Sequence, residues 1–386
     1  MTLTAKQEEG LKIAVSRYKA HEPYTCIAGY AGTGKSTLIN FIIRALNLTD
    51  DEVCYIAYTG KAAQILRTKG CPNAMTAHRL LYKSIQRSDG TFVHFPRRPI
   101  ISFELIVVDE ISMLPKSMWD LLLSHRIPVI ALGDPGQLPP VMAENNHILD
   151  TPHIFLDEVM RQAAESEIIR LTMDIRNGKS LTPFMGQEVR IVERTELLEP
   201  GFLSWGDQII CGKNATRNSI NEIMRKIVMQ TDNPEPQVGD RLICLKNDWE
   251  CINTTGDALV NGLNGTLTDL KYTDDNPFMQ KTPVITFTPS IEDSSPFCGL
   301  EIDYKLLVEH EPTVNSNTFK SIPRYFHPKE FDYGYCITCH KAQGSEYDKV
   351  IVLEEFLRGE NRETHQRWLY TAATRAAKKL IIVRNY

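Results

Sequence analysis

The segment GYAGTGKS, from Gly29 to Ser36, has the residues needed to hold a chain of phosphates. It matches the pattern G-x-x-x-x-G-K-[ST], in which a glycine-rich turn points several backbone N–H groups at one spot. We expect Lys35 to neutralise the β- and γ-phosphates of ATP and the Ser36 hydroxyl to bind Mg²⁺. The residues expected to contact the nucleotide here are Gly29, Ala31, Gly32, Thr33, Gly34, Lys35, Ser36 and Thr37.

Further polar groups with catalytic potential follow two apolar runs. Residues 105–108 predict a buried strand, and Asp109 and Glu110 come directly after it. Asp109 would hold the Mg²⁺, usually through water, and Glu110 is placed to polarise an attacking water molecule. A second apolar run, 128–132, leads into GDPGQLPPV, where Gln137 could contact the γ-phosphate or its water.

These residues need a parallel sheet to bring them together. TCIA, residues 25–28, predicts a short buried strand, and STLINFIIRALNL, residues 36–48, has apolar residues at helical spacing. Ligands of open parallel sheets bind at the carboxyl ends of the strands, which is where all three polar segments would lie. The sequence therefore predicts an α/β fold with parallel sheets flanked by helices.

Composition limits the classes of protein. The 386 residues suggest two or three domains, and 42% hydrophobic and 24% charged residues are ordinary for a soluble protein. The sequence has no apolar run of about 20 residues and no signal-peptide pattern, so we expect a cytoplasmic protein without a membrane partner. The net charge of −5 requires any nucleic-acid binding to use a local groove.

The cysteines offer an alternative interpretation. Cys336 to His340 fit C-x-x-C-H, the spacing that attaches a c-type haem. That interpretation requires export, for which the N-terminal residues offer no route. Nine cysteines are scattered along the chain, several in apolar strand-like runs where a reduced cysteine packs as a small hydrophobe. We therefore expect Cys339 to pack in a core.

Eight segments in a fixed order resemble the superfamily 1 helicases, and within them the RecD/Dda branch of superfamily 1B. The resemblance runs from residue 7 to residue 376. The segments are GYAGTGKS (29–36), AYTGKAA (57–63), TAHRLL (76–81), VVDEISM (107–113), GDPGQLPP (133–140), EVMRQ (158–162), TCHKAQGSEYD (338–348) and LYTAATRA (369–376).

The resemblance implies two RecA-like domains with ATP between them and single-stranded DNA across their tops. It implies that Gln7 reads adenine and that Gly344 and Glu346 face the nucleotide. Arg161 and Arg375 match arginines that reach the γ-phosphate, a role that suits a guanidinium supplied across a cleft.

The implied domains are 1A (1–81 and 101–155), a hairpin 1B (82–100), 2A (156–237 and 333–386) and an SH3-like β-barrel 2B (238–332). Ser88, Asp89 and Gly90 are a hairpin-turn signal. In this family the hairpin is a pin that splits the duplex, and Phe92 and Phe95 are the candidates to stack on its last base pair. Residues 311–331 are the least readable, and we interpret them as a loop near DNA.

The DNA contacts carry over as hydroxyl, imidazole, amide and basic groups in loops after strands and at one helix start. Groups of this kind typically position phosphates without reading bases. The residues are Thr59, Lys61, Thr76, His78, Lys213, Asn214, Arg217, Thr338, His340 and Lys341.

The sequence and the resemblance together predict an ATP-dependent DNA helicase that moves 5′ to 3′. The direction is implied by the RecD/Dda resemblance alone. We expect single-stranded DNA and single-strand/duplex junctions as partners, together with a single-strand-binding protein or replisome components. The expected state is a monomer, and the setting is phage DNA replication or recombination. The alternatives are an RNA helicase, a protein-displacing translocase or a nucleotide-regulated DNA-binding subunit of a larger complex.

Overall fold

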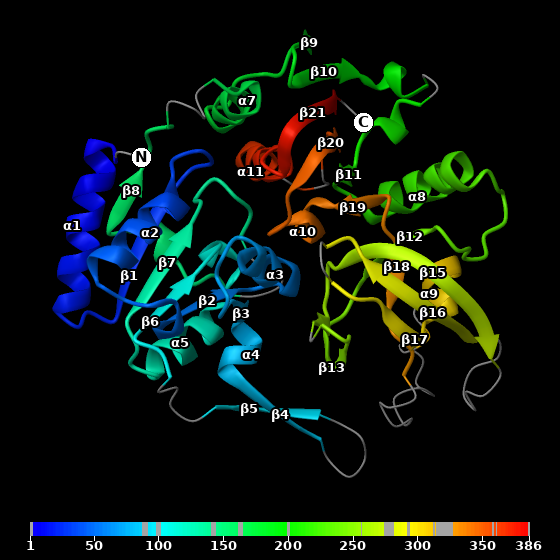
Figure 1. The fold of residues 1–386 in the computed structure, drawn as a ribbon. Coiled ribbons are helices and arrows are strands. Elements are labelled where there is room, and N and C mark those ends of the chain that lie inside the picture. The colour runs from blue at the N-terminus through cyan, green and yellow to red at the C-terminus, as the bar shows by residue number, and fades with distance from the viewer. Residues whose placement is uncertain are drawn as a thin grey trace.

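The computed structural model describes residues 3–384 except 87–91, 98–101, 140–143, 161–164, 199–200, 256, 274–281, 292–293, 312, 314–326, 357–358 and 360. It contains two α/β domains side by side, with a β-rich insertion below the second and a thin hairpin extending from the first (Figure 1). The two sheets belong to different stretches of the chain and face each other through their loops.

The first domain is built on a six-stranded parallel sheet of order β3-β2-β6-β7-β1-β8. Buried β-branched and leucine side chains on both faces explain the continuous apolar runs in the sequence. Its elements are α1 (Ala5–Lys19), β1 (Tyr24–Gly29), α2 (Lys35–Ala45), β2 (Val53–Ala57), α3 (Gly60–Thr68), β3 (Met75–Thr76), α4 (Ala77–Leu81), β6 (Leu105–Val108), α5 (Lys116–Ser124), β7 (Val129–Gly133) and β8 (Ile154–Leu156).

The second domain repeats this plan with the sheet order β19-β11-β20-β21-β10-β9, parallel except for the β9–β10 edge pair. Its strands come from both sides of the insertion. Its elements are α7 (Glu167–Arg176), β9 (Phe184–Met185), β10 (Val189–Glu193), β11 (Gln208–Cys211), α8 (Asn214–Met229), β19 (Cys336–Thr338), α10 (Cys339–Ala342), β20 (Tyr347–Leu353), α11 (Arg362–Ala373) and β21 (Ala376–Arg384).

The insertion forms a five-stranded antiparallel sheet of order β17-β16-β15-β12-β18 and a small hairpin, β13–β14. Most of residues 311–331 lies outside the described part of the chain, although the Lys329 ammonium bonds to the Asp248 carboxylate at 2.6 Å. The elements are β12 (Arg241–Cys244), β13 (Asp248–Ile252), β14 (Ala258–Leu259), β15 (Asn264–Thr273), β16 (Thr282–Pro289), β17 (Phe297–Glu301), α9 (Tyr304–Glu309) and β18 (Phe331–Tyr333).

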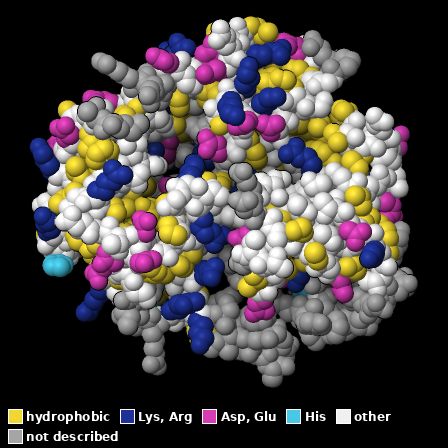
Figure 2. All heavy atoms as spheres, in the orientation of Figure 1, with side chains coloured by type: hydrophobic (Ala, Val, Ile, Leu, Met, Phe, Trp, Pro, Cys, Tyr) yellow, Lys and Arg dark blue, Asp and Glu magenta, His cyan; other side chains and the backbone are white. Residues whose placement is uncertain are grey.

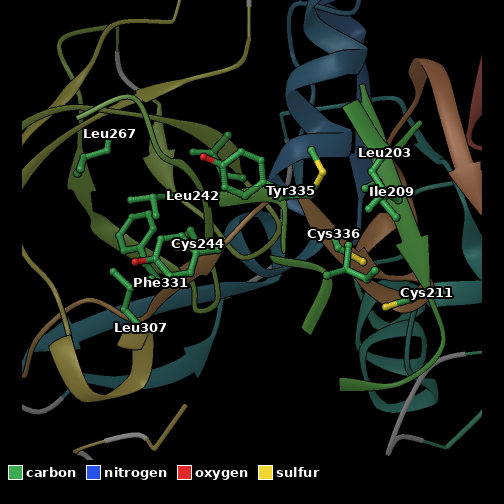
Figure 3. Close-up of a cluster of buried hydrophobic side chains, with 14 of the residues drawn as sticks. Leu203, Ile209, Cys211, Leu242, Cys244, Leu267, Leu307, Phe331, Tyr335 and Cys336 are labelled. Atoms are coloured by element: carbon green, nitrogen blue, oxygen red, sulfur yellow. The ribbon is translucent and has the colours of Figure 1, made fainter. Parts of the chain in front are cut away.

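One hydrophobic core joins the insertion to the second domain. Leu242 and Phe331 of the insertion belong to the same buried cluster as Ile209 and Cys336 of the second sheet. Figure 3 shows these pairs on opposite sides of Tyr335. Because the cluster is continuous, the insertion and the second domain should move as one unit when the two α/β domains open or close.

The cysteines of the C-x-x-C-H segment pack inside the second domain. Cys336 and Cys339 are both fully buried, and burial raises the pKa of the Cys339 thiol to about 12. Among the described residues no group of His, Cys, Asp and Glu side chains is arranged to hold a metal ion. The thiols are therefore neutral core side chains here, in agreement with the packing role predicted for Cys339.

Candidate active site

The glycine-rich loop has the backbone of a phosphate-binding loop. It connects β1 to α2, and Gly32 and Gly34 have positive φ angles of 76° and 78°, which suit glycine. The Lys35 ammonium bonds to the carbonyls of Gly29 at 2.6 Å and Tyr30 at 3.0 Å. Burial lowers the pKa of Lys35, and the nearby carboxylates, Asp134 foremost, oppose this shift.

Gln7 lies behind this loop. Its side-chain amide is buried and donates to the Thr33 carbonyl at 3.1 Å, while its amide oxygen accepts from the Thr4 N–H at 3.0 Å. A Cβ atom at Gly34 would lie 2.5 Å from the Gln7 nitrogen, so only glycine allows this approach. Gln7 therefore supports the loop, and its role in reading adenine stays a prediction.

Asp109 and Glu110 lie at the carboxyl end of β6, beside the strand β7 that separates them from β1. Burial raises the pKa of Asp109, and the positive charge of Lys35 opposes that shift. Burial likewise raises the pKa of Glu110, opposed by Arg375. The two cations therefore help to keep both carboxylates ionised in a largely buried site.

Two buried oxygen atoms in this cleft have no hydrogen-bond partner among the residues that the structure describes. They are Oε2 of Glu110 and Oε1 of Gln137. Buried acceptors without partners are costly, and a ligand or water that donates to them removes the cost. Both oxygens fit the predicted task of holding a water molecule for attack on a phosphate.

Arg375 reaches the same cleft from the second domain. It lies just after Thr374, the C-cap of α11, and its guanidinium lies 3.4 Å from the Glu110 carboxylate and donates to the Ser345 carbonyl at 3.2 Å. Gly344, with φ 71°, faces the first domain, because a Cβ there would lie 3.2 Å from both Glu110 Oε2 and Thr59 Oγ1.

The other two nucleotide-contact predictions are not placed in this cleft. Glu346 is exposed and lies 3.5 Å from the Lys69 ammonium. Arg161 lies outside the described residues.

The DNA-contact residues predicted for the first domain are partly buried at the domain interface. Thr59 and Thr76 cap the N-termini of α3 and α4 with their side chains. Lys61 is only 8% exposed, and its ammonium bonds to the Tyr347 hydroxyl of the second domain at 3.1 Å. His78 lies between the rings of Tyr58 and Tyr82. Contact of these residues with DNA stays a prediction.

Several of the DNA-contact residues predicted for the second domain already form hydrogen bonds or ion pairs within the protein. Just before α8, the backbone N–H groups of Gly212 and Lys213 donate to the Glu355 carboxylate. The same carboxylate pairs with the Lys213 ammonium at 3.3 Å. Arg217 pairs with Asp332 at 2.8 Å and also donates to Asn214.

The remaining three lie at β19 and α10. Thr338, which is buried, precedes α10, and His340 within that helix is half-buried. Lys341 donates to Asn261 at 3.1 Å, and burial lowers the pKa of its ammonium. A phosphate at Lys213, Arg217 or Lys341 would have to compete with the bonds that these side chains already make.

A pocket of about 310 Å³ lies between the first domain and the β13–β14 hairpin of the insertion. No single motif predicted it, because its walls are far apart in sequence. Tyr82, Arg79, Lys83 and Arg97 line one wall, and Asp257 lies on the other, where it pairs with Arg67. Figure 2 shows Lys and Arg side chains gathered from the middle of this face downward. Basic and aromatic groups together suit the binding of single-stranded nucleic acid.

The predicted pin is a two-stranded antiparallel hairpin, β4 (Tyr82–Gln86) and β5 (Phe92–Pro96), which extends away from the first domain (Figure 1). Phe95 is 47% exposed. The turn at residues 88–90 lies outside the described residues, as does the side chain of Phe92.

We expect Phe95→Ala to reduce duplex unwinding while single-stranded DNA still stimulates ATP hydrolysis, because an exposed ring on the pin stacks only on a duplex end. The loss in unwinding rate should be about tenfold, the size of one stacking contact. Phe184→Ala is a matched control, since Phe184 is 46% exposed at the far edge of the second sheet. Equal loss of unwinding and ATPase would point to a folding role for Phe95.

Comparison with known proteins agrees with this geometry. The AAA domain model matches residues 2–196, and the UvrD-like helicase C-terminal domain model matches residues 333–383. The chain is 27% identical to the ATP-dependent DNA helicase Dda of Enterobacteria phage T4, over 60% of this chain and 58% of Dda. It is 34% identical to the ATP-dependent RecD2 DNA helicase of Deinococcus radiodurans, over 40% of this chain and 22% of RecD2. The chain thus spans less than two thirds of either relative.

A solved structure shares the overall fold. The Pif1 helicase from Bacteroides, crystallised with ADP-AlF3 and single-stranded DNA, has a TM-score of 0.54 and 19% identity, over 99% of this chain and 92% of Pif1. At this identity the likeness concerns the fold, and the predicted fold of two RecA-like P-loop domains is confirmed.

Two RecA-like domains that face each other across a phosphate-binding loop, an acidic pair and an arginine from the opposite domain define a helicase-type ATPase. The chain belongs to the AAA-domain family, and it is a superfamily 1B helicase of the RecD/Dda/Pif1 type that hydrolyses ATP. The predicted family is therefore confirmed. In the described part of the chain, no helix has the length and apolarity to cross a membrane.

Proposed function

We propose that this chain is an ATP-dependent DNA helicase that moves 5′ to 3′ along single-stranded DNA and unwinds duplex ahead of it. The observation that carries the proposal is the contact of Arg375 with Glu110 across the interdomain cleft. An arginine supplied by the second domain makes hydrolysis depend on domain closure, which is what a motor requires. The DNA substrate and the direction are supported by the likeness to Dda and RecD2.

In the proposed cycle, ATP binds between the domains and draws them together. Lys35 leaves the carbonyls of Gly29 and Tyr30 and contacts the phosphates, and Arg375 contacts the γ-phosphate. Glu110 and Gln137 orient the water molecule that attacks it. Product release lets the domains reopen, and alternating grip on the strand moves it by a small step.

Mg²⁺ fits this site as the expected cofactor. Ser36 lies in the first turn of α2, and Asp109 directly follows β6 at the same sheet edge, so a hydroxyl and a carboxylate would supply the oxygen ligands that a hard cation prefers. Bound there, Mg²⁺ would neutralise charge on the phosphates. The residues proposed to act beside it are Lys35, Glu110, Gln137, Arg161 and Arg375.

The substrate strand is proposed to pass over both domains, beside the pocket lined by Arg79, Lys83 and Arg97. Junctions between single and double strand would meet the β4–β5 hairpin. We propose that the protein acts as a monomer, with a single-strand-binding protein or replisome components as further partners.

A strand-displacement assay tests this function. We expect unwinding of a DNA duplex with a 5′ single-stranded tail and little unwinding of the same duplex with a 3′ tail. ATP hydrolysis should rise strongly with single-stranded DNA, because the strand favours the closed domains. RNA duplexes with the same tails separate DNA from RNA preference. An ATPase rate indifferent to DNA would refute the motor, and preference for the 3′ tail would refute the direction.

A further inference from the structure

The hydroxyl of Tyr370 lies between two nucleotide-binding loops of the opposite domain. Tyr370, on α11, is 2% exposed. Its hydroxyl donates to the Asp134 carboxylate at 2.6 Å and accepts from the backbone N–H of Ala31, in the phosphate-binding loop, at 3.0 Å. A Cβ atom at Gly136 would lie 3.0 Å from the Tyr370 ring, so the loop after β7 passes directly against the phenol.

The second domain also holds the far end of that loop. The Leu138 N–H donates to the Thr371 hydroxyl at 3.0 Å, and the Gln343 side chain donates to the Leu138 carbonyl at 3.2 Å. Gln137 lies between these two anchors, with its own N–H bonded to the Asp134 carbonyl at 3.2 Å. Both ends of the segment that carries Gln137 are therefore fixed by side chains of the opposite domain.

We propose that Tyr370, assisted by Thr371, is a positioning residue that ties the placement of Gln137 against the nucleotide to closure of the two domains. The inference rests on the proposed function and names the contact through which that function controls hydrolysis. Tyr370 acts through the loop and through Ala31 and Asp134.

The energetics favour such a link. When the domains separate, the Asp134 carboxylate and the Ala31 N–H exchange the Tyr370 hydroxyl for water, so the charge-assisted bond to Asp134 stabilises the protein only while the domains are together. Burial, and then the charge of Asp134, raise the pKa of Tyr370, so the phenol stays neutral and keeps its proton for Asp134. Arg375 lies at the end of the same helix, so closure brings Arg375 and Gln137 to the cleft together.

The test compares Tyr370→Phe with a matched control, Tyr335→Phe. The Tyr335 hydroxyl also donates to a carboxylate, that of Asp240 at 3.1 Å, and accepts from a backbone N–H, that of Arg241 at 3.2 Å. Tyr335 is 1% exposed and lies in the core shared with the insertion, away from the cleft. Both substitutions delete one buried hydroxyl with two similar bonds, so they should lower thermal stability alike.

We expect Tyr370→Phe to lower kcat for ATP hydrolysis at saturating single-stranded DNA about tenfold, the effect of losing one charge-assisted bond, with a smaller change in KM. Tyr335→Phe should keep the kcat of the unaltered protein. If single-stranded DNA stimulates the unaltered protein but Tyr370→Phe and Tyr335→Phe have the same kcat, the inference is overturned. If single-stranded DNA does not stimulate the unaltered protein, the proposed function is overturned instead. If Tyr370→Phe does not fold, Thr371→Val replaces it; unchanged kcat in that variant overturns the inference.

Discussion

Replacing Lys35 with alanine should reduce ATP hydrolysis at least about 100-fold, because the ammonium is the group in the phosphate-binding loop that neutralises the transferring phosphoryl. In the structure its charge is already directed to the loop, where it bonds to two loop carbonyls within 3.0 Å. Folding should survive, since Lys35 begins α2 and alanine is the best helix former.

Phosphate release in the presence of single-stranded DNA measures this prediction, and thermal unfolding checks the fold. Arg44→Ala is the matched control, because Arg44 is an exposed cation at the other end of the same helix. Arg44→Ala should hydrolyse ATP normally. Normal turnover by Lys35→Ala would refute the assignment of the phosphate-binding loop.

The nucleotide side of the site could be predicted from sequence because its residues follow apolar strands. Asp109 directly follows β6 and Gln137 follows β7, and parallel strands place their carboxyl ends at one edge of the sheet. Strand pattern and local motif therefore fix the position together. The parallel sheets, and an insertion rich in short strands, could be read in the same way.

Contacts across the domain interface could not be predicted, since they depend on side chains far apart in the chain. Lys61 reads as a loop cation, yet it is 8% exposed and its partner Tyr347 is 286 positions away. The sequence presents Lys213 and Arg217 as basic groups at a helix start, yet Lys213 pairs with Glu355 and Arg217 pairs with Asp332, both more than 100 positions away. Tyr370 lies within the segment 369–376 that resembles a helicase motif, but the sequence does not show which groups its hydroxyl contacts.

The pocket beside the hairpin had no sequence signal for a similar reason. One wall combines α3 and α4 of the first domain with the β4–β5 hairpin, and the other belongs to the β13–β14 hairpin, which the sequence describes only as short strands and turns. The pocket forms where the β13–β14 hairpin packs against the first domain, which carries the β4–β5 hairpin. A pocket whose walls are more than 150 positions apart in the chain can be recognised only in the folded structure.

The second large effect is expected at Arg375. Arg375→Ala should lower kcat for ATP hydrolysis by about 1,000-fold or more, the usual contribution of an arginine that stabilises the transferring phosphoryl from a second domain. Removal also takes away the largest opposing influence on Glu110, whose pKa burial already raises. More of the Glu110 carboxyl would then be protonated at a given pH and unable to polarise water.

Arg375→Lys distinguishes the two contributions of the arginine. It keeps a positive charge near Glu110, yet it lacks the fork that bonds the Thr371 and Ser345 carbonyls at once. We therefore expect intermediate activity.

Arg367→Ala is the matched control, because Arg367 is an exposed cation on α11 whose guanidinium pairs with Glu363 at 3.0 Å. Single-turnover hydrolysis at saturating ATP reports the chemical step, and binding of MgADP reports the intact P-loop. If Arg375→Ala kept its rate while Arg367→Ala lost it, the arginine that serves the γ-phosphate would have to be another one. Loss of rate in Arg375→Ala with MgADP binding retained places the defect in catalysis, because only the transition state needs the guanidinium from across the cleft.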